Sequence, residues 1–534
     1  MKRYQLILLA VLSGVLLSLP WLELLPGWIL FGALVPLLFV EDYVFRKQAV
    51  LPDTSVLMYA FLGFFLWNVL TCWWIAYAAP FGMVVIVTLN ALLMAIVWWL
   101  FHKMKRSFSG SLGQVSLLAY WLAFEYLHFN WDMEWPWLTL GNGFANQVEL
   151  IQWYEYLGVL GGSLWIIVGN LILFQALKNV VREYRLRTVV AYTGFFLLVV
   201  LLPMMLSLER YRSYNETGVG YEVVVLQPNI DPYHEKFESE TAVDQLTTLL
   251  RLGDSLITPQ TDFVVGPETA LQPLVENESL RFESQLIDFY NRVGSYPELN
   301  VIMGATTRKY YQEGAPPSET ARKDTAESLY YDLYNSALLI NRKSDVQIYH
   351  KSKLVSGTEK MPFSRYFAFV EKFIVDLGGT TGSLGKQGEP SNFISVSGLK
   401  VAPVICFESV FGQYLGEFVQ QGAGLIFILT NDGWWKDSPG YRQLLAYARL
   451  RAVETRRSIA RSANTGVSAL INQRGDVVKS TAWWKETALK GQLKANQKVT
   501  FYAQYGDFIG RVSAFVSVLF FLSLLVRKQT KGGY

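Results

Sequence analysis

The strongest constraint on the fold is a series of apolar runs that recur at close to the length needed to cross a membrane. A spanning helix needs about 20 mainly apolar residues. The chain has 534 residues, of which 51% are hydrophobic and only 17% are charged, and the charged share lies below that of ordinary soluble domains. We therefore predict eight transmembrane helices, of which the first, second and fifth are short and need flanking residues to span. The runs are Gln5–Leu19, Trp28–Val40, Val56–Tyr77, Met83–Phe101, Val115–Leu127, Leu157–Leu177, Val189–Leu206 and Ile509–Val526.

The orientation of these helices is predicted by the Lys and Arg residues that flank them. Basic residues precede the first run and follow the second, fourth, sixth and eighth runs. The alternate loops, Pro20–Gly27, Ala78–Gly82 and Phe129–Tyr154, contain neither Lys nor Arg. Because basic residues are enriched on the cytoplasmic side, both termini are predicted to be cytoplasmic. Eight helices with both termini cytoplasmic then place the long polar segment, which lies between the seventh and eighth helices, on the outer face.

The polar segment has the pattern of an α/β domain. Short β-type runs alternate with helical patterns at Ala242–Leu256 and Leu280–Val293, which is typical of layered α/β architecture. The predicted strands are Glu222–Leu226, Phe263–Val265, Val301–Met303, Ala337–Ile340, Val346–Tyr349, Val401–Ile405, Leu425–Leu429 and Ser468–Ile471. We therefore predict a seven-helix membrane domain (1–207), an extracytoplasmic domain (208–508), a C-terminal transmembrane helix (509–527) and a cytoplasmic tail (528–534).

Several function classes lack their sequence motifs in this chain. The net charge of +3 is too small to argue for a nucleic-acid partner. The four histidines show no HExxH or Cys/His spacing, so no metal site is predicted. No GxSxG elbow, Walker loop or GxGxxG loop is present, which weighs against a serine hydrolase, an ATPase and a dinucleotide-dependent dehydrogenase. We therefore expect chemistry that needs no cofactor.

One of the two cysteines ends an apolar strand pattern. Cys406 follows the β-branched run in Lys400–Gly412 and is followed at once by Phe407 and Glu408, whereas Cys72 lies inside an apolar run. A lone cysteine most often behaves as a small, inert hydrophobic residue. A thiol presented at a strand end beside a carboxylate is instead typical of a nucleophile. Partners elsewhere in the chain decide between these interpretations.

Other charged residues follow predicted strands and give the thiol such partners. Glu268 follows a strand and a Gly-Pro step, and Lys351 and Lys353 follow the segment that ends at Tyr349. Strand ends of an α/β sheet are where such folds bind ligands. A carboxylate can take the thiol proton, an ammonium can stabilise the thiolate and a developing oxyanion, and the thiolate can attack a carbonyl. We therefore predict a nucleophilic thiol enzyme.

These motifs together resemble the carbon–nitrogen hydrolase (nitrilase) superfamily. The matching stretches are Leu226–Ile230, Gly266–Leu271, Tyr334–Ile340, Cys406–Ser409 and Thr430–Gly475. The resemblance implies a four-layer αββα sandwich. It also implies a general base at Glu268, a stabilising cation at Lys351, which lies eight positions before Glu359 as the family's lysine does, and a nucleophile at Cys406. The supporting residues implied by the same positions are Glu359, Glu408, Phe407 and Asn335.

The membrane helices extend the resemblance to a membrane-bound acyltransferase of that superfamily. This implies a bacterial inner-membrane enzyme with a periplasmic catalytic domain. Its acyl donor would be a phospholipid, phosphatidylethanolamine, and its acceptor the diacylated N-terminal cysteine of an apolipoprotein. Departures from the family motifs occur at Gln227–Asn229 and Ser356–Glu359. A membrane-tethered amidase and a non-catalytic transporter or sensor remain alternatives.

Overall fold

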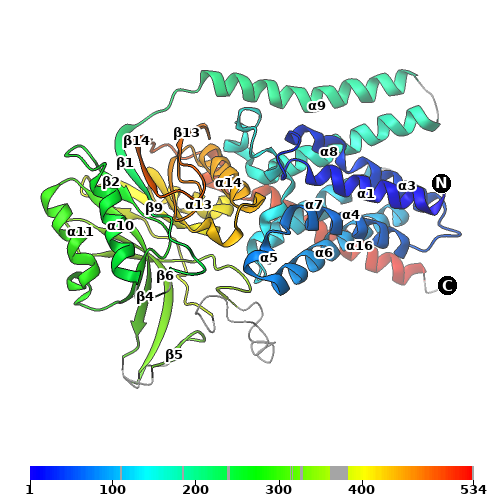
Figure 1. The fold of residues 1–534 in the computed structure, drawn as a ribbon. Helices are drawn as coiled ribbons and strands as arrows, with labels where there is room; N and C mark the ends of the chain where they lie inside the picture. Colours follow the sequence, from blue (N-terminus) through cyan, green and yellow to red (C-terminus); the bar gives the residue numbers. More distant parts are fainter. Residues whose placement is uncertain are drawn as a thin grey trace. The chain divides into compact units, whose positions relative to one another are not determined.

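The structure is a computed structural model of the chain. It divides the chain into two compact units, both drawn in Figure 1. The first unit comprises residues 1–76, 80–213 and 505–534, and the second comprises residues 77–79 and 214–504. The structure describes residues 1–531 except for 109–110, 183–185, 237, 239–240, 313, 316, 325–328 and 361–382. The last three residues of the predicted tail therefore lie outside the described part.

The first unit is helical, and each of the eight predicted apolar runs lies in helix. Its α-helices are α1 (Arg3–Ser18), α2 (Leu30–Ala33), α3 (Val35–Arg46), α4 (Thr54–Cys72), α5 (Ile75–Ala78), α6 (Pro80–Ser107), α7 (Ser111–Asn130), α8 (Tyr154–Arg182), α9 (Leu186–Ser213) and α16 (Phe508–Lys531). Short 3-10 helices are η1 (Gly27–Ile29), η2 (Pro136–Leu138), η3 (Leu140–Phe144) and η4 (Val148–Leu150). The predicted third run is divided, because α4 ends at Cys72 and α5 begins at Ile75.

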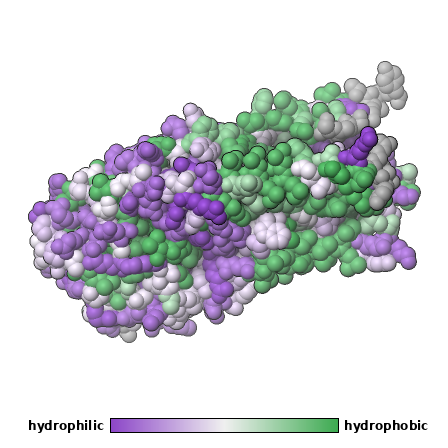
Figure 2. Space-filling view, turned by 90° about the horizontal axis from the view of Figure 1, so that it is seen from above, coloured by the Kyte–Doolittle hydropathy of each residue, from purple (hydrophilic) through white to green (hydrophobic). Residues whose placement is uncertain are grey.

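Within the described residues, six helical segments are long and apolar enough to cross a membrane. Helix α1 is apolar but has only 16 residues. Helix α7 has 20 residues, but Gln114, Glu125 and His128 lower its hydropathy. A spanning role for these two helices therefore stays a prediction. Hydrophobic residues dominate the visible surface of the helical unit in Figure 2, and α9 exposes Val190 and Phe195, as expected of a surface that faces lipid.

Close packing and buried charge hold the helices of this unit together. A Cβ atom added to Gly14 of α1 would lie 2.4 Å from the Gly63 carbonyl of α4, a small-residue contact typical of membrane helices. Ion pairs also link α3 to α6 and α8. We call this group the helix-end cluster; its members are Glu41, Asp42, His102, Lys105 and Lys178. The His102 Nδ1 to Glu41 Oε1 distance is 2.8 Å, and Lys178 Nζ lies 3.0 Å from Asp42 Oδ1.

The second unit contains two sheets. The eight-stranded sheet has the order β14-β1-β2-β4-β6-β5, with β3 paired to β4 and β7 paired to β6. Its strands are β1 (Val219–Gln227), β2 (Phe263–Val265), β3 (Leu271–Val275), β4 (Asn300–Tyr310), β5 (Arg322–Lys323), β6 (Tyr330–Ile340), β7 (Gln347–His350) and β14 (Thr487–Ala495). The six-stranded sheet has the order β13-β12-β11-β10-β9-β8. Its strands are β8 (Phe393–Ile394), β9 (Lys400–Ile405), β10 (Leu425–Thr430), β11 (Ser458–Ala463), β12 (Ala469–Ile471) and β13 (Val477–Ser480).

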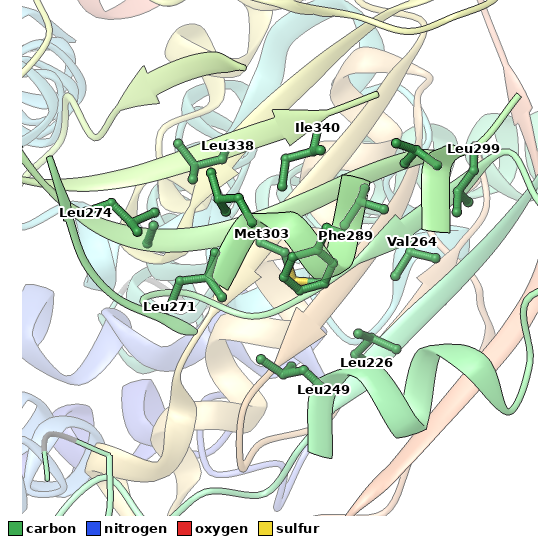
Figure 3. Close-up of a cluster of buried hydrophobic side chains, with 14 of the residues drawn as sticks. Leu226, Leu249, Val264, Leu271, Leu274, Phe289, Leu299, Met303, Leu338 and Ile340 are labelled. Atoms are coloured by element: carbon green, nitrogen blue, oxygen red, sulfur yellow. The ribbon is translucent and has the colours of Figure 1, made fainter. Parts of the chain in front are cut away.

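Helices cover the outer face of each sheet. Leu249 of α10 (Ala242–Asp254) and Phe289 of α11 (Ser284–Ser295) pack against Val264 and Met303 of the first sheet, as Figure 3 shows. Each fully buried side chain of this kind contributes roughly 1.5–3 kcal/mol. The second sheet is covered by helices α13 (Gly412–Gln420) and α14 (Pro439–Thr455).

The inner faces of the two sheets pack against each other. The rings of Phe263 on β2 and Phe427 on β10 are 5.0 Å apart. The Ser462 hydroxyl on β11 donates to the Leu226 carbonyl on β1 at 2.7 Å. The unit is therefore an αββα sandwich, and the predicted fold class is confirmed. Short helices η6 (Leu280–Phe282), η8 (Cys406–Val410), η9 (Asp432–Trp435) and α15 (Phe501–Tyr505) complete the described elements.

Candidate active site

The predicted nucleophile lies at a strained turn. Strand β9 is buried from Val401 to Ile405 and pairs in parallel with β10, so its carboxyl end points to one edge of the sheet. Cys406 follows it with φ at +49° and starts η8. A left-handed conformation costs a non-glycine residue roughly 1–2 kcal/mol, and such strain is concentrated at functional sites. The hydroxyl of Ser409 donates to the Cys406 carbonyl at 2.7 Å and closes the turn.

Glu268 lies in the loop that follows β2. The Gly304 amide of β4 donates to the Pro267 carbonyl at 3.1 Å. A Cβ atom at Gly304 would lie 2.4 Å from that carbonyl oxygen and 2.6 Å from the Glu268 Cα. Only glycine at this position lets the loop lie so close to β4. The carboxylate of Glu268 is thereby fixed at the end of the first sheet and is 7% exposed.

Lys351 follows β7 directly and is almost fully buried. Its backbone amide donates to the Asn335 carbonyl of β6 at 2.8 Å, which extends the β6–β7 pairing by one residue. Its ammonium lies 3.0 Å from Glu268 Oε1 and 2.8 Å from Glu359 Oε1. The alternative lysine, Lys353, is half-buried and places its ammonium over the Phe411 ring instead. Of these two lysines, Lys351 is therefore the one that contacts the Glu268 carboxylate.

The Asn335 side chain joins the two carboxylates. Its Nδ2 lies 2.7 Å from Glu268 Oε1 and 3.1 Å from Glu359 Oε1, and donates to both. The other oxygen of Glu359 accepts from the Val355 amide at 2.8 Å. Each carboxylate therefore has its orientation fixed by several donors, as a site that must hold a precise geometry requires.

Glu408 connects the nucleophile turn to the lysine loop. Its Oε2 accepts from the Ile405 amide at 2.8 Å, while Oε1 accepts from the Ser352 amide and the Tyr349 hydroxyl, both at 2.7 Å. Burial raises the pKa of Glu408 to about 7, although these hydrogen bonds act in the opposite direction. Its hydrogen bonds thus go to two backbone turns and one hydroxyl. Phe407 is buried beside it, with its ring 5.1 Å from that of Phe411.

The electrostatics of the site favour a protonated thiol at rest. Burial raises the pKa of Cys406 to about 12, and the negative charge of Glu268 adds to this effect, whereas Lys351 and a hydrogen bond with Thr430 oppose it. Burial also acts to raise the pKa of Glu268, but Lys351 and Lys236 outweigh it and hold that pKa below its usual value. The site therefore combines a protonated thiol with an ionised carboxylate whose charge acts on that thiol.

Two features of the site are absent from the sequence-based prediction. The first is Lys236, whose Nζ donates to the Glu268 carbonyl at 2.8 Å. The second is the buried ion pair between Arg461 and Asp432, with two nitrogen–oxygen distances of 2.7 and 2.9 Å. Thr430, which contacts both Cys406 and Asp432, is held by this pair. No motif singles out Lys236, but Arg461 and Asp432 lie in the stretch that resembles the nitrilase superfamily most strongly.

Comparisons with known proteins agree with this architecture. Residues 223–499 match the carbon–nitrogen hydrolase family, and residues 13–172 match the N-terminal domain of apolipoprotein N-acyltransferases. Apolipoprotein N-acyltransferase of Chlorobaculum tepidum is 28% identical, over 98% of this chain and 97% of its own length. The enzyme of that name from Geobacter metallireducens is also 28% identical, over 94% of this chain and 91% of its own length.

Solved structures of nitrilase-superfamily proteins align with about half of the chain. Nit3 of Saccharomyces cerevisiae, with 15% identity and a TM-score of 0.36, covers 52% of this chain and 90% of its own. The apolar helices and the relatives together identify a membrane protein. With more than half of its length matching the family model, the chain belongs to the carbon–nitrogen hydrolase family, and it joins that domain to the N-terminal domain of apolipoprotein N-acyltransferases.

Proposed function

We propose that this protein transfers an acyl chain from a phospholipid to the N-terminal amine of the S-diacylglyceryl-cysteine of apolipoproteins, the last step of bacterial lipoprotein maturation. The observation that supports the proposal is the contact of Lys351 with Glu268, whose charges both act on the Cys406 thiol, in a chain that also matches the N-terminal domain of apolipoprotein N-acyltransferases. Glu268 is assigned as general base, Lys351 as stabilising cation and Cys406 as nucleophile. Glu359, Glu408, Asn335 and Phe407 support them.

In the first half-reaction, Cys406 takes the acyl chain. The Sγ–H proton passes to Glu268 while Sγ attacks the ester carbonyl of the phospholipid, and Lys351 stabilises the developing oxyanion. The bond from the carbonyl carbon to the glycerol oxygen then breaks. That oxygen takes the proton back from Glu268 and leaves as a lysophospholipid, so that an acyl thioester remains on Cys406.

In the second half-reaction, the acceptor amine releases the acyl chain. The neutral α-amine attacks the thioester carbonyl and forms the amide bond as the carbon–sulfur bond breaks. One amine proton passes to Glu268 and then to the Cys406 thiolate, which restores the resting thiol. A thioester of this kind is a reasonable acyl donor because its thiolate leaves readily and an amine is a stronger nucleophile than water.

The membrane helices favour this activity over a tethered amidase. An amidase with the same triad needs only an anchor, whereas residues 13–172 match the N-terminal domain of apolipoprotein N-acyltransferases. Both proposed substrates are lipids and reside in the bilayer, where phosphatidylethanolamine is the expected donor. We also propose the periplasmic orientation, with cytoplasmic termini, in the bacterial inner membrane. The predicted boundaries near residues 207 and 508 are supported by the end of α9 at Ser213 and the start of α16 at Phe508.

The test uses the full chain purified in detergent micelles. It is incubated with phosphatidylethanolamine that carries a fluorescent acyl chain and with a diacylated lipopeptide. The expected products are a fluorescent triacylated lipopeptide and, when the acceptor is omitted, a fluorescent acyl group on the peptide that contains Cys406. If the lipopeptide amine stayed free and the protein instead hydrolysed a small amide, the proposal would be wrong and the protein would be a membrane-tethered amidase. Phosphatidylglycerol in place of phosphatidylethanolamine tests the headgroup.

A further inference from the structure

Lys236 is buried within a loop whose neighbouring residues are exposed. The loop follows β1, and Tyr233, His234 and Glu235 all face solvent, whereas Lys236 is only 4% exposed. Lysine is almost never fully buried unless it is paired, because removing its charge from water is costly. Burial of the Lys236 ammonium therefore lowers the stability of the folded state, and the groups that contact the ammonium indicate its role.

The Lys236 ammonium is held by two neutral acceptors. It donates to the backbone carbonyl of Glu268 at 2.8 Å. In the amide orientation that satisfies its neighbours, the Asn431 oxygen accepts from the same ammonium at 3.1 Å and from Trp434 Nε1 at 3.3 Å. No ion pair of Lys236 is present among the residues that the structure describes. Its charge is thus fixed next to Glu268 without being neutralised by a direct contact.

The balance of negative and positive charges in the site indicates a role for the Lys236 ammonium. Two carboxylates of the site, Glu268 and Glu359, both contact Lys351. We call these three residues, together with Lys236, the carboxylate–lysine cluster. Burial lowers the pKa of Lys236 to about 8, while the charges of Glu268 and Cys406 act to raise it. The side chains of Gln245 and Gln272, which reach the Lys236 carbonyl, are neutral.

We propose that Lys236 is a positioning residue of this site, which holds the Glu268 backbone and offsets the negative charge that moves from Glu268 to Cys406 as the thioester forms. Lys351 alone would face two carboxylates and then a carboxylate and a thiolate. With Lys236, two ammoniums face two negative charges before and after the proton moves. The role of Lys236 as part of an acyl-transfer site rests on the proposed function.

Three substitutions separate charge from hydrogen bonding. Lys236→Met removes both, Lys236→Gln keeps a donor for the Glu268 carbonyl, and Lys236→Arg keeps the charge. Lys386→Met is the matched control, because Lys386 is an exposed lysine of the same unit. The first readout is the rate at which iodoacetamide alkylates Cys406 as pH is raised, followed by mass spectrometry of the Cys406 peptide. The second is the pH profile of thioester formation from phosphatidylethanolamine without acceptor.

Loss of the charge is expected to slow alkylation of Cys406 by about tenfold at a given pH, since one pKa unit of the thiol is a tenfold change in thiolate. Lys236→Met and Lys236→Gln should both show this loss, and Lys236→Arg and Lys386→Met should not. In the wild-type protein, thioester formation should decline above about pH 8 as Lys236 loses its proton. The arginine variant should keep its rate there.

Two results would overturn the proposal. If Lys236→Gln matched the wild-type protein in both readouts, the residue would act through its hydrogen bond alone. If the alkaline decline were the same in Lys236→Arg, another group would cause it. The wild-type profile and the glutamine variant decide the matter even if Lys236→Met does not fold. Should the protein fail to acylate the lipopeptide, the proposed function would fall, while the alkylation rates would still report on Lys236.

Discussion

Each of the two units buries a cluster of oppositely charged side chains. The two clusters differ in how deeply their lysines are buried and in whether a thiol lies near the charges. In the helix-end cluster, Glu41 and Asp42 face His102, Lys105 and Lys178 from neighbouring helices. The lysines stay partly exposed, at 16% and 30% of the side chain. In the carboxylate–lysine cluster, Lys351 and Lys236 are nearly inaccessible, and the thiol of Cys406 lies within their electrostatic reach.

This difference shows that buried charge alone does not identify an active site. Ion pairs between helices fix helix register, and their net contribution to stability is small because desolvation opposes the attraction. The carboxylate–lysine cluster instead lies beside a thiol whose pKa its charges affect, and in the proposed mechanism its cations stabilise either position of the thiol proton. The presence of a thiol next to the charges distinguishes the carboxylate–lysine cluster from the helix-end cluster.

The largest expected effect comes from Cys406→Ala. Without the thiol no thioester forms, so transfer of the fluorescent acyl chain should fall by at least about a thousandfold. The matched control is Cys72→Ala, which removes the other thiol, buried in helix α4 of the first unit. It should retain activity. If Cys406→Ala transferred the acyl chain as fast as the wild-type protein, Cys406 would not be the nucleophile. The thiol would then no longer distinguish the carboxylate–lysine cluster from the helix-end cluster.

Glu268→Gln should lower acyl transfer by roughly 10²–10⁴-fold, the usual contribution of a general base. The same change should make Cys406 easier to alkylate at alkaline pH, because the charge of Glu268 contributes to the raised pKa of the thiol. Opposite changes in the two rates are measured by the lipid assay and by iodoacetamide labelling. A parallel fall in both rates would indicate damage to the turn rather than loss of the base.

The sequence indicates which residues of this candidate site lie near one another where those residues follow strand ends, and their catalytic roles stay predictions. Cys406, Glu268 and Lys351 each follow a β-type run, so their meeting at the sheet edges follows from topology. The choice of Lys351 over Lys353 needed the spacing to Glu359, since both lysines follow the same strand. Lys236 could not be found in this way, because its loop has the composition of an exposed turn and its burial depends on Asn431 and Glu268 from distant parts of the chain.

The membrane helices show the same limit. Hydropathy located all eight helical runs, because apolar composition is a local property. Their ends were less predictable: α6 extends to Ser107 and α9 to Ser213, beyond the apolar runs, because charged residues continue a helix once its apolar part has formed. The helix-end cluster was not predicted either, since pairing between Glu41 and Lys105 depends on how α3 packs against α6.

Glu408→Gln is expected to have a smaller effect on rate and a distinct effect on stability. The carboxylate accepts from the Ile405 and Ser352 amides, so the amide side chain should loosen the nucleophile turn and slow acyl transfer by about tenfold. The pKa of Glu408 is raised from 4.5 to about 7 by burial. The folded state therefore binds its proton more tightly than the unfolded state, and stability from this group falls as pH rises between those values.

Thermal unfolding of the wild-type protein and of Glu408→Gln, measured from pH 4.5 to pH 7, tests that sign. Glutamine is neutral throughout and resembles the protonated acid. The stability of the wild-type protein relative to the variant should therefore decrease as pH rises and level off above about pH 7. An increase over the same range would mean that Glu408 is held as a carboxylate by its donors.

Glu41→Gln should have the smallest effect on catalysis and still lower stability. Removing one partner of a buried ion pair leaves His102 and Lys105 without their carboxylate, at a cost of roughly 3–5 kcal/mol. Thermal unfolding in detergent should therefore occur at lower temperature, while the rate of thioester formation at a temperature where the variant is folded should stay within about twofold. The exposed Glu238→Gln, in the second unit, is the control for loss of a carboxylate. A purely structural ion pair affects how much of the protein is folded, and not how fast the folded protein reacts. A large loss of rate in folded Glu41→Gln would therefore mean that the helix-end cluster does more than hold α3 to α6.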